Sequence, residues 1–144
     1  MDEDIPADIL LRRWAASPRN RPVGLVYAFC KIGGKTTYLH RMIMSAPKGV
    51  VVDHVNGNGL DNRRANLRFA TSSQNAANTK PNCNPLLFRG VVANKDSFSA
   101  RIQVNGKRIF DGVFLTVEEA AAAYDRLAIA HFGEFAVLNF GIPA

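Results

Sequence analysis

An aspartate followed directly by a histidine stands near the middle of the chain, at Asp53 and His54. Carboxylate and carboxamide oxygens are ligands that Mg²⁺ prefers in proteins. A histidine, whose ordinary pKa is about 6.5, can be neutral at physiological pH and can take a proton from water. Asp53, His54 and the later Asn75 therefore form a minimal set for metal-assisted hydrolysis of a phosphodiester, with two metal ligands and one base.

The stretch around this pair, residues 51–78, is rich in carboxamides. Its six asparagines are Asn56, Asn58, Asn62, Asn66, Asn75 and Asn78. A plainer interpretation stays open, because asparagines are common in turns and an Asp-His pair can simply end a strand. Neighbouring strand residues also point to opposite faces, so Asp53 and His54 serve one site only if the strand ends or distorts there.

The elements expected around these residues follow the order strand, loop, strand, helix. "GVVVDH" reads as a short buried strand, "VNGNGLDNRRAN" as a loop and "LRFAT" as a second strand. Thr71 stands three residues before Gln74, as in a capping box, so a helix is expected to begin at Thr71 and to carry Asn75 in its first turn.

Three further elements are expected before this unit. Apolar residues in the segment from Ile5 to Ala16 predict a short helix. "GLVYAFCKI" and "KTTY", separated by Gly33-Gly34, predict a hairpin. "LHRMIMSAP" predicts a helix that ends before Pro47.

These blocks together resemble the HNH nuclease family, in the homing-endonuclease-like branch common in phages and bacteria. The resemblance covers roughly residues 36–80 and rests on "YLHRMIM", on the Asp-His strand, on "LDNRRANLR" and on the helix that follows. It implies a small ββα-metal domain that binds one divalent ion, Mg²⁺ or Mn²⁺, and cleaves DNA.

The resemblance also implies roles for individual residues. Asp53 and Asn75 would be the metal ligands, His54 would be the general base and Asn66 would pin the loop. His40, in the "LHR" block, is expected to be a structural, hydrogen-bonded histidine; contact with DNA or support of the site stays open as an alternative. A structural role is likewise expected for His131, on the last predicted helix.

A second folding unit is expected after the run "NTKPNCNP", which has two prolines and no periodicity. Three β-rich runs follow, the last two joined by Asn105-Gly106, a strong hairpin signal. Thr116 and Glu119 then form a capping box before an alanine-rich helix that Gly133 ends. The three strands carry an excess of basic residues and the helix an excess of acidic ones, so one side suits DNA.

Residues 88–140 resemble the plant ethylene-response-factor, or APETALA-type, DNA-binding domain, a three-stranded sheet on one helix. The blocks "FRGV" and "VFLTVEEAAAAYDRLAIAHFGEFAVLNF" carry the resemblance. Val92 and Asp111 depart from it, standing where arginine and leucine are usual, so much of the contact is expected with phosphates. The DNA-binding residues expected are Arg89, Arg101, Gln103, Lys107, Arg108 and Phe110.

Composition agrees with a nucleic-acid partner. The 144 residues carry a formal charge of +6, which favours a polyanion, either nucleic acid or an acidic membrane surface. No apolar run is long enough to span a bilayer, and the N-terminus is acidic where a signal peptide is basic. Cys30 and Cys83 lack metal-ligand spacing and are expected to be reduced thiols. We expect a protein of the cytoplasm of a bacterial or phage-infected cell.

The sequence thus predicts an α+β chain with three parts: residues 1–80 with the nuclease domain (core about 36–80), a linker at 81–87, and a DNA-binding sheet-and-helix domain at 88–144. The expected function is metal-dependent cleavage of double-stranded DNA, of the homing type, with no membrane and no small-molecule substrate. Two alternatives stay open: a non-enzymatic DNA-binding regulator, and a nonspecific HNH nuclease. The target sequence and the oligomeric state are not predicted.

Overall fold

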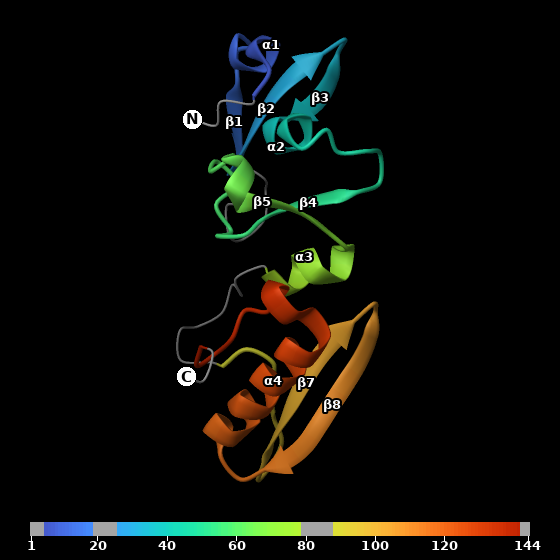
Figure 1. Cartoon of the computed structure of the whole chain (residues 1–144). Helices are drawn as coiled ribbons and strands as arrows, with labels where there is room; N and C mark the ends of the chain where they lie inside the picture. The colour runs from blue at the N-terminus through green and yellow to red at the C-terminus, as the bar shows by residue number, and fades with distance from the viewer. Residues whose placement is uncertain (1–4, 19–25, 79–87, 142–144) are drawn as a thin grey trace. The chain divides into compact units, whose positions relative to one another are not determined.

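The computed structural model describes residues 5–18, 26–78 and 88–141 (Figure 1). Its helices and strands form the α+β fold that the sequence predicts, grouped in two compact units, Met1–Thr71 and Ser72–Ala144. The domain bounds drawn from the sequence, with a first domain that ends at residue 80, stay a prediction. The linker predicted at 81–87 lies outside the described residues.

The first unit opens with a three-stranded antiparallel sheet in the order β1-β2-β3 (Figure 1). Strands β2 (Val26–Ile32) and β3 (Lys35–Tyr38) form the hairpin that the sequence predicts. Gly33 and Gly34 make its turn with φ values of 54° and 77°. Glycine adopts this left-handed conformation without the steric cost that a side chain brings.

The N-terminal helix predicted over Ile5–Ala16 is wrong in extent. Helix α1 covers only Ala7–Leu10, and Ala15–Pro18 forms strand β1, which pairs with β2. The Trp14 indole N–H donates to the Ile9 carbonyl oxygen at 2.9 Å, which satisfies an oxygen at the end of the short helix. Pairing with β2 supplies the backbone of Ala15–Pro18 with partners, a long-range gain that local propensity does not report.

The Asp-His pair lies in a two-stranded antiparallel hairpin, β4 (Val51–His54) with β5 (Leu67–Ala70). A single 3₁₀ turn, η1 (Arg64–Asn66), leads into β5. Helix α2 (Leu39–Ile43) covers the hairpin through a small apolar core of Ile43, Val52 and Leu67. The hairpin and helix therefore hold the end of β4 in a fixed place within the first unit.

Helix α3 (Ser72–Asn78) begins directly after Thr71, so the predicted order of strand, loop, strand and helix is confirmed. By its contacts α3 groups with the second unit, where it packs against α4 and η2. Asn75 therefore belongs to the second unit, whereas Asp53 and His54 belong to the first.

The second unit contains a three-stranded antiparallel sheet in the order β6-β7-β8, of which Figure 1 labels β7 and β8. Its strands are β6 (Val91–Ala93), β7 (Phe98–Val104) and β8 (Lys107–Phe114). The predicted turn at Asn105 and Gly106 joins β7 to β8, with φ values of 49° and 81°. Positive φ at both positions is the conformation for which Asn-Gly hairpins are selected.

Helix α4 (Val117–Phe132) packs on this sheet, with the turn η2 (Gly133–Phe135) after it. The predicted capping box is present, because Thr116 Oγ1 accepts from the Glu119 amide while a Glu119 carboxylate oxygen accepts from the Thr116 amide. Small side chains form the buried face of the helix and let it lie close to the sheet. They are Ala120, Ala121, Ala123 and Ala128, all fully buried.

Polar contacts link the segment after η2 to helix α4 and to the residues before β6. Asp125 is buried, with 7% of its surface exposed. Its carboxylate accepts from the backbone amides of Asn139 and Phe140 at 2.8 and 3.0 Å. The Asn139 side chain accepts from the Arg89 amide and donates to the Arg89 carbonyl oxygen. Gly90 has φ of 70°, and a Cβ there would lie 1.9 Å from the Tyr124 ring, so only glycine fits beside that ring.

Two further findings concern the described residues alone. Cys30 is buried within β2, and Cys83 lies outside the described residues. In the part of the chain that the structure describes, no helix combines the length and the apolar character needed to cross a bilayer.

We predict that Asp125→Ala destabilises the second unit by about 2 kcal/mol, because it removes the buried carboxylate that accepts from two part-buried backbone amides. Urea unfolding followed by circular dichroism measures the change. Arg126→Ala, at the exposed neighbouring position on α4, is the matched control and should change the free energy of unfolding little. Equal effects of the two substitutions would contradict the assignment.

Candidate active site

Strand β4 ends in two buried polar side chains, because Asp53 and His54 are each 5% exposed. They have different partners, in agreement with the alternation of a strand. A carboxylate oxygen of Asp53 accepts from Nε of Arg68, the residue opposite it on β5, at 3.0 Å. His54 Nε2 lies 3.2 Å from the Asn62 side-chain oxygen.

The His54 ring lies in a cluster of rings. Its centroid is 5.0 Å from that of His40, with the two planes at 76°, and 5.7 Å from that of Tyr27. His40 is buried as well, on α2, and its ring stacks on Tyr38 at 5.7 Å. Side chains of β2 and α2 therefore pack around the predicted base, which stands at the end of β4, and the ring of His40 contacts it directly.

Burial is the largest influence on His54 and lowers the pKa of its imidazole below 6.5. The hydrogen bond with Asn62 and the negative charges of Asp53 and Asp61 act in the opposite direction and raise that pKa, but they do not outweigh burial. The ring is therefore mainly neutral at pH 7. With the Asn62 oxygen as acceptor, Nε2 carries the ring proton, and the basic nitrogen of the neutral ring is Nδ1.

The loop between β4 and β5 is held by carboxamides. Asn66 makes three hydrogen bonds: its Oδ1 accepts from the Asn56 amide at 3.0 Å, and its Nδ2 donates to Asn56 Oδ1 at 3.0 Å and to the Asp61 carbonyl oxygen at 2.8 Å. Asn58 caps the backbone amide of Leu60. Asn66 thus closes the loop on itself immediately before β5.

Asp61 stabilises the same loop through its charge. Its carboxylate forms an ion pair with Arg63 at 2.6 Å and accepts from Asn56 Nδ2 at 2.8 Å. These contacts hold the pKa of the Asp61 carboxyl well below its usual range, and the hydrogen bond from Arg63 has the largest effect. Asp61 is therefore ionised wherever the protein is folded at ordinary pH, and its charge acts on His54.

Sequence reasoning missed three residues around His54 and Asp53. Asn62 was expected mainly to shape a turn or contact backbone; its Nδ2 does donate to the Leu60 carbonyl oxygen, but its side-chain oxygen also contacts the imidazole. Tyr27, which packs on His54, and Arg68, which pairs with Asp53, were not singled out. Arg68 stands opposite Asp53 in an antiparallel pair, so the hairpin register is a signal from which that partner could have been found.

The donor set fits a hard divalent cation. Asp53 offers a buried carboxylate and Asn75, on α3, a carboxamide; both supply the oxygen ligands that Mg²⁺ takes, while water commonly fills its other positions. Within residues 5–18, 26–78 and 88–141, no group of three or more His, Cys, Asp or Glu side chains is arranged to hold a metal ion. A set of one carboxylate and one carboxamide lies outside that class.

The second unit carries the side chains expected to bind DNA. On the exposed face of β7 and β8, Arg101 pairs across the strands with Phe110, and Gln103 pairs with Arg108. Phe110 is 59% exposed. Lys107 is exposed at the start of β8. The register therefore brings Arg101, Gln103, Arg108 and Phe110 to one sheet face, whereas Lys107, paired with Val104, alternates to the other face.

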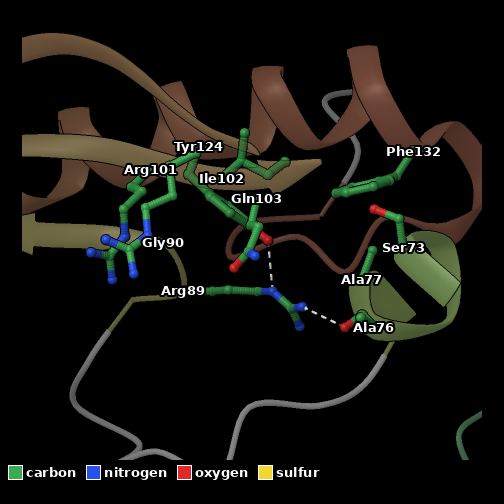
Figure 2. A pocket seen from close by; sticks show the side chains of 11 residues that line it. Ser73, Ala76, Ala77, Arg89, Gly90, Arg101, Ile102, Gln103, Tyr124 and Phe132 are labelled. Carbon is green, nitrogen blue, oxygen red and sulfur yellow. Dashed lines mark hydrogen bonds between the residues drawn. The ribbon is translucent and has the colours of Figure 1, made fainter. Parts of the chain in front are cut away.

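Arg89 differs from the other five, because its guanidinium is engaged within the protein. Nε donates to the Tyr124 hydroxyl at 2.6 Å, and Nη2 donates to the Ala76 carbonyl oxygen of α3 at 3.3 Å (Figure 2). Burial is the main cause that raises the pKa of the Tyr124 hydroxyl, so this hydroxyl stays protonated.

We predict that the pKa of His54, followed by NMR titration of its ring, lies below 6.5 and falls further in Asn62→Ala. The direction follows because the hydrogen bond with Asn62 favours the charged ring. His54→Gln identifies the signal. Asn58→Ala removes a carboxamide of the same loop that contacts backbone instead of the imidazole, and should leave the His54 pKa nearly unchanged. A rise in Asn62→Ala would contradict the assignment.

Comparison with known proteins agrees with this geometry. Residues 38–77 match the family model described as HNH endonuclease. The chain is 35% identical over 107 residues to an uncharacterised HNH endonuclease of Acanthamoeba polyphaga mimivirus, a match that covers 70% of this chain and 56% of the relative. It is also 35% identical over 102 residues to an ethylene-responsive transcription factor of Arabidopsis thaliana, covering 67% of this chain and 63% of that protein.

The chain thus spans little more than half the length of these curated relatives. Both resemblances noted in the sequence are confirmed at the level of similarity: residues 38–77 match the HNH endonuclease family model, in a chain that is similar both to an HNH endonuclease and to an ethylene-responsive transcription factor.

Proposed function

We propose that this chain is a metal-dependent DNA endonuclease that hydrolyses phosphodiester bonds. The observation that carries the proposal is the buried His54, with its lowered pKa, directly beside Asp53 at the end of β4 and inside the HNH endonuclease region. A neutral imidazole is what a general base needs at pH 7. DNA as the partner is supported by the similarity to an HNH endonuclease and to a transcription factor.

His54 would take the proton of the attacking water, with Nδ1 as the accepting atom. Asn62 would hold the ring through Nε2, and the rings of His40 and Tyr27 would restrict its rotation. Asn66 would fix the loop that presents Asn62. These contacts reduce the reorganisation that the base needs when the substrate arrives.

Asp53 and Asn75 would hold the divalent ion, Mg²⁺ or Mn²⁺. When bound, such an ion stabilises negative charge that develops on phosphate oxygens. Arg68 pairs with Asp53 and would orient its carboxylate. The role of Asn75 rests on the HNH match, which extends to residue 77, and on its place in the helix that follows β5.

The exposed face of β7 and β8 would dock on double-stranded DNA through Arg101, Gln103, Arg108 and Phe110, with Lys107 beside the β7–β8 turn as a further contact. Two arginines on one face suit the phosphate backbone, and an exposed aromatic ring suits contact with bases or sugars. A homing role, which would make the cleavage site-specific, is part of the proposal, as is the cytoplasm of a bacterial or phage-infected cell.

We predict that His54→Ala lowers the rate of plasmid nicking in Mg²⁺ by about 10²- to 10⁴-fold, because the base is lost. The wild-type rate should rise with pH through a value below 6.5 and then stay level. The measurement is conversion of supercoiled plasmid to nicked circles. His131→Ala, an exposed histidine on α4, is the control and should cleave normally. Equal nicking by His54→Ala and wild type would sink the proposal.

The same assay separates the alternatives. A non-enzymatic regulator would bind DNA and leave it intact with every divalent ion. A nonspecific nuclease would cut random fragments without a preferred site, whereas a homing-type enzyme would give discrete ends on cleavage mapping.

For the docking face we predict that Arg108→Ala weakens DNA binding similarly across sequences and reduces the slope of log K against log salt concentration by about 1, if Arg108 contacts phosphate. Fluorescence anisotropy at several salt concentrations measures this. Arg126→Ala removes an exposed arginine on α4, away from the docking face, and should have little effect. Unchanged binding of Arg108→Ala at low salt would refute its role.

A further inference from the structure

Helix α3 has two distinct faces. Successive residues of a helix are about 100° apart, so Ser73, Ala76 and Ala77 share one face while Asn75 lies roughly opposite. All three residues of the first face line a cavity of about 360 Å³ in the second unit (Figure 2). The second unit therefore contacts α3 from the side opposite to the predicted metal ligand.

Two hydrogen bonds attach that face to the second unit. The Asn105 backbone amide, at the turn between β7 and β8, donates to Ser73 Oγ at 3.1 Å. Arg89 Nη2 donates to the Ala76 carbonyl oxygen at 3.3 Å (Figure 2). One bond is at the start of α3 and one is a turn later, so together they fix the rotation of the helix about its axis.

Arg89 is itself held in place. Its Nε donates to the hydroxyl of the buried Tyr124, and its backbone is bound on both sides by the Asn139 side chain. A guanidinium with its position fixed by α4 and by the chain end is a rigid support for α3. This arrangement accounts for an arginine whose polar contacts point into the protein instead of away from it.

The cavity connects this support with the docking face. Arg101, Gln103 and Arg108 line it together with the α3 residues. The side chains proposed to meet DNA and the helix proposed to carry a metal ligand therefore border the same space. The hydrogen bonds from Asn105 and Arg89 orient α3 beside this space, in addition to the packing of α3 against α4 and η2.

We propose that Ser73 and Arg89 are positioning residues for Asn75. They hold α3 by its opposite face, so the unit that docks on DNA also sets the direction of the metal-ligand side chain. The inference rests on the proposed function, in which Asn75 binds the divalent ion. It assigns Arg89 to the support of α3 and not to DNA contact.

The test measures Mn²⁺ affinity by electron paramagnetic resonance of the free ion and DNA affinity by anisotropy, on the full chain. Ser73→Ala should weaken Mn²⁺ binding about tenfold, as loss of a supporting partner commonly does, and leave DNA affinity unchanged. Ser73→Thr keeps the acceptor oxygen and should restore Mn²⁺ binding. Amide hydrogen exchange of α3 should be faster in Ser73→Ala, with the exchange of α4 unchanged.

Arg89→Ala separates the two roles of that residue. Weaker Mn²⁺ binding with DNA affinity unchanged is expected; weaker DNA binding with Mn²⁺ affinity unchanged would overturn the proposal and make Arg89 a DNA contact. If wild type binds Mn²⁺ and nicks plasmid while Ser73→Ala and Arg89→Ala match it in both, the inference alone fails. If wild type neither binds Mn²⁺ nor nicks, both the inference and the proposed function fail.

Discussion

The antiparallel pair of β4 and β5 is the constraint on which the candidate site depends. It places Arg68 opposite Asp53 and leaves a long polar loop between the strands, whose backbone groups need partners. Asn66 supplies several at once, since a carboxamide both donates and accepts. The abundance of asparagine here is therefore a solution to loop closure, and Asn62 faces His54 because the loop is closed.

Burial lowers the pKa of His54 whereas its polar neighbours raise it, and the effect of burial is the larger one. The neighbouring carboxylates and Asn62 favour the charged ring, but the surrounding rings of Tyr27 and His40 exclude water and favour the neutral one. The lowered pKa suits the role proposed for His54, because a general base must be neutral before it accepts a proton. An exposed histidine beside the same carboxylates would instead have a raised pKa.

Local signals predicted the local structure well. The turn at Asn105-Gly106, the capping box at Thr116 and the order of elements around Asp53 were readable because each depends on residues close in sequence. The pairing of Ala15–Pro18 with β2 and the contact of Asn62 with His54 were not, because each depends on where distant segments meet. Resemblance supplied the role proposed for Asn66, which neither periodicity nor ligand chemistry could assign.

The grouping of α3 with the second unit has a physical basis in its length. A helix of seven residues is too short to be stable alone in water, so it must take its stability from packing. α4, η2, Arg89 and the β7–β8 turn provide that packing. A fragment cut within the predicted linker would keep the sequence of α3 and lose these supports. The HNH match, which extends to residue 77, therefore includes a helix that takes its packing from the second unit.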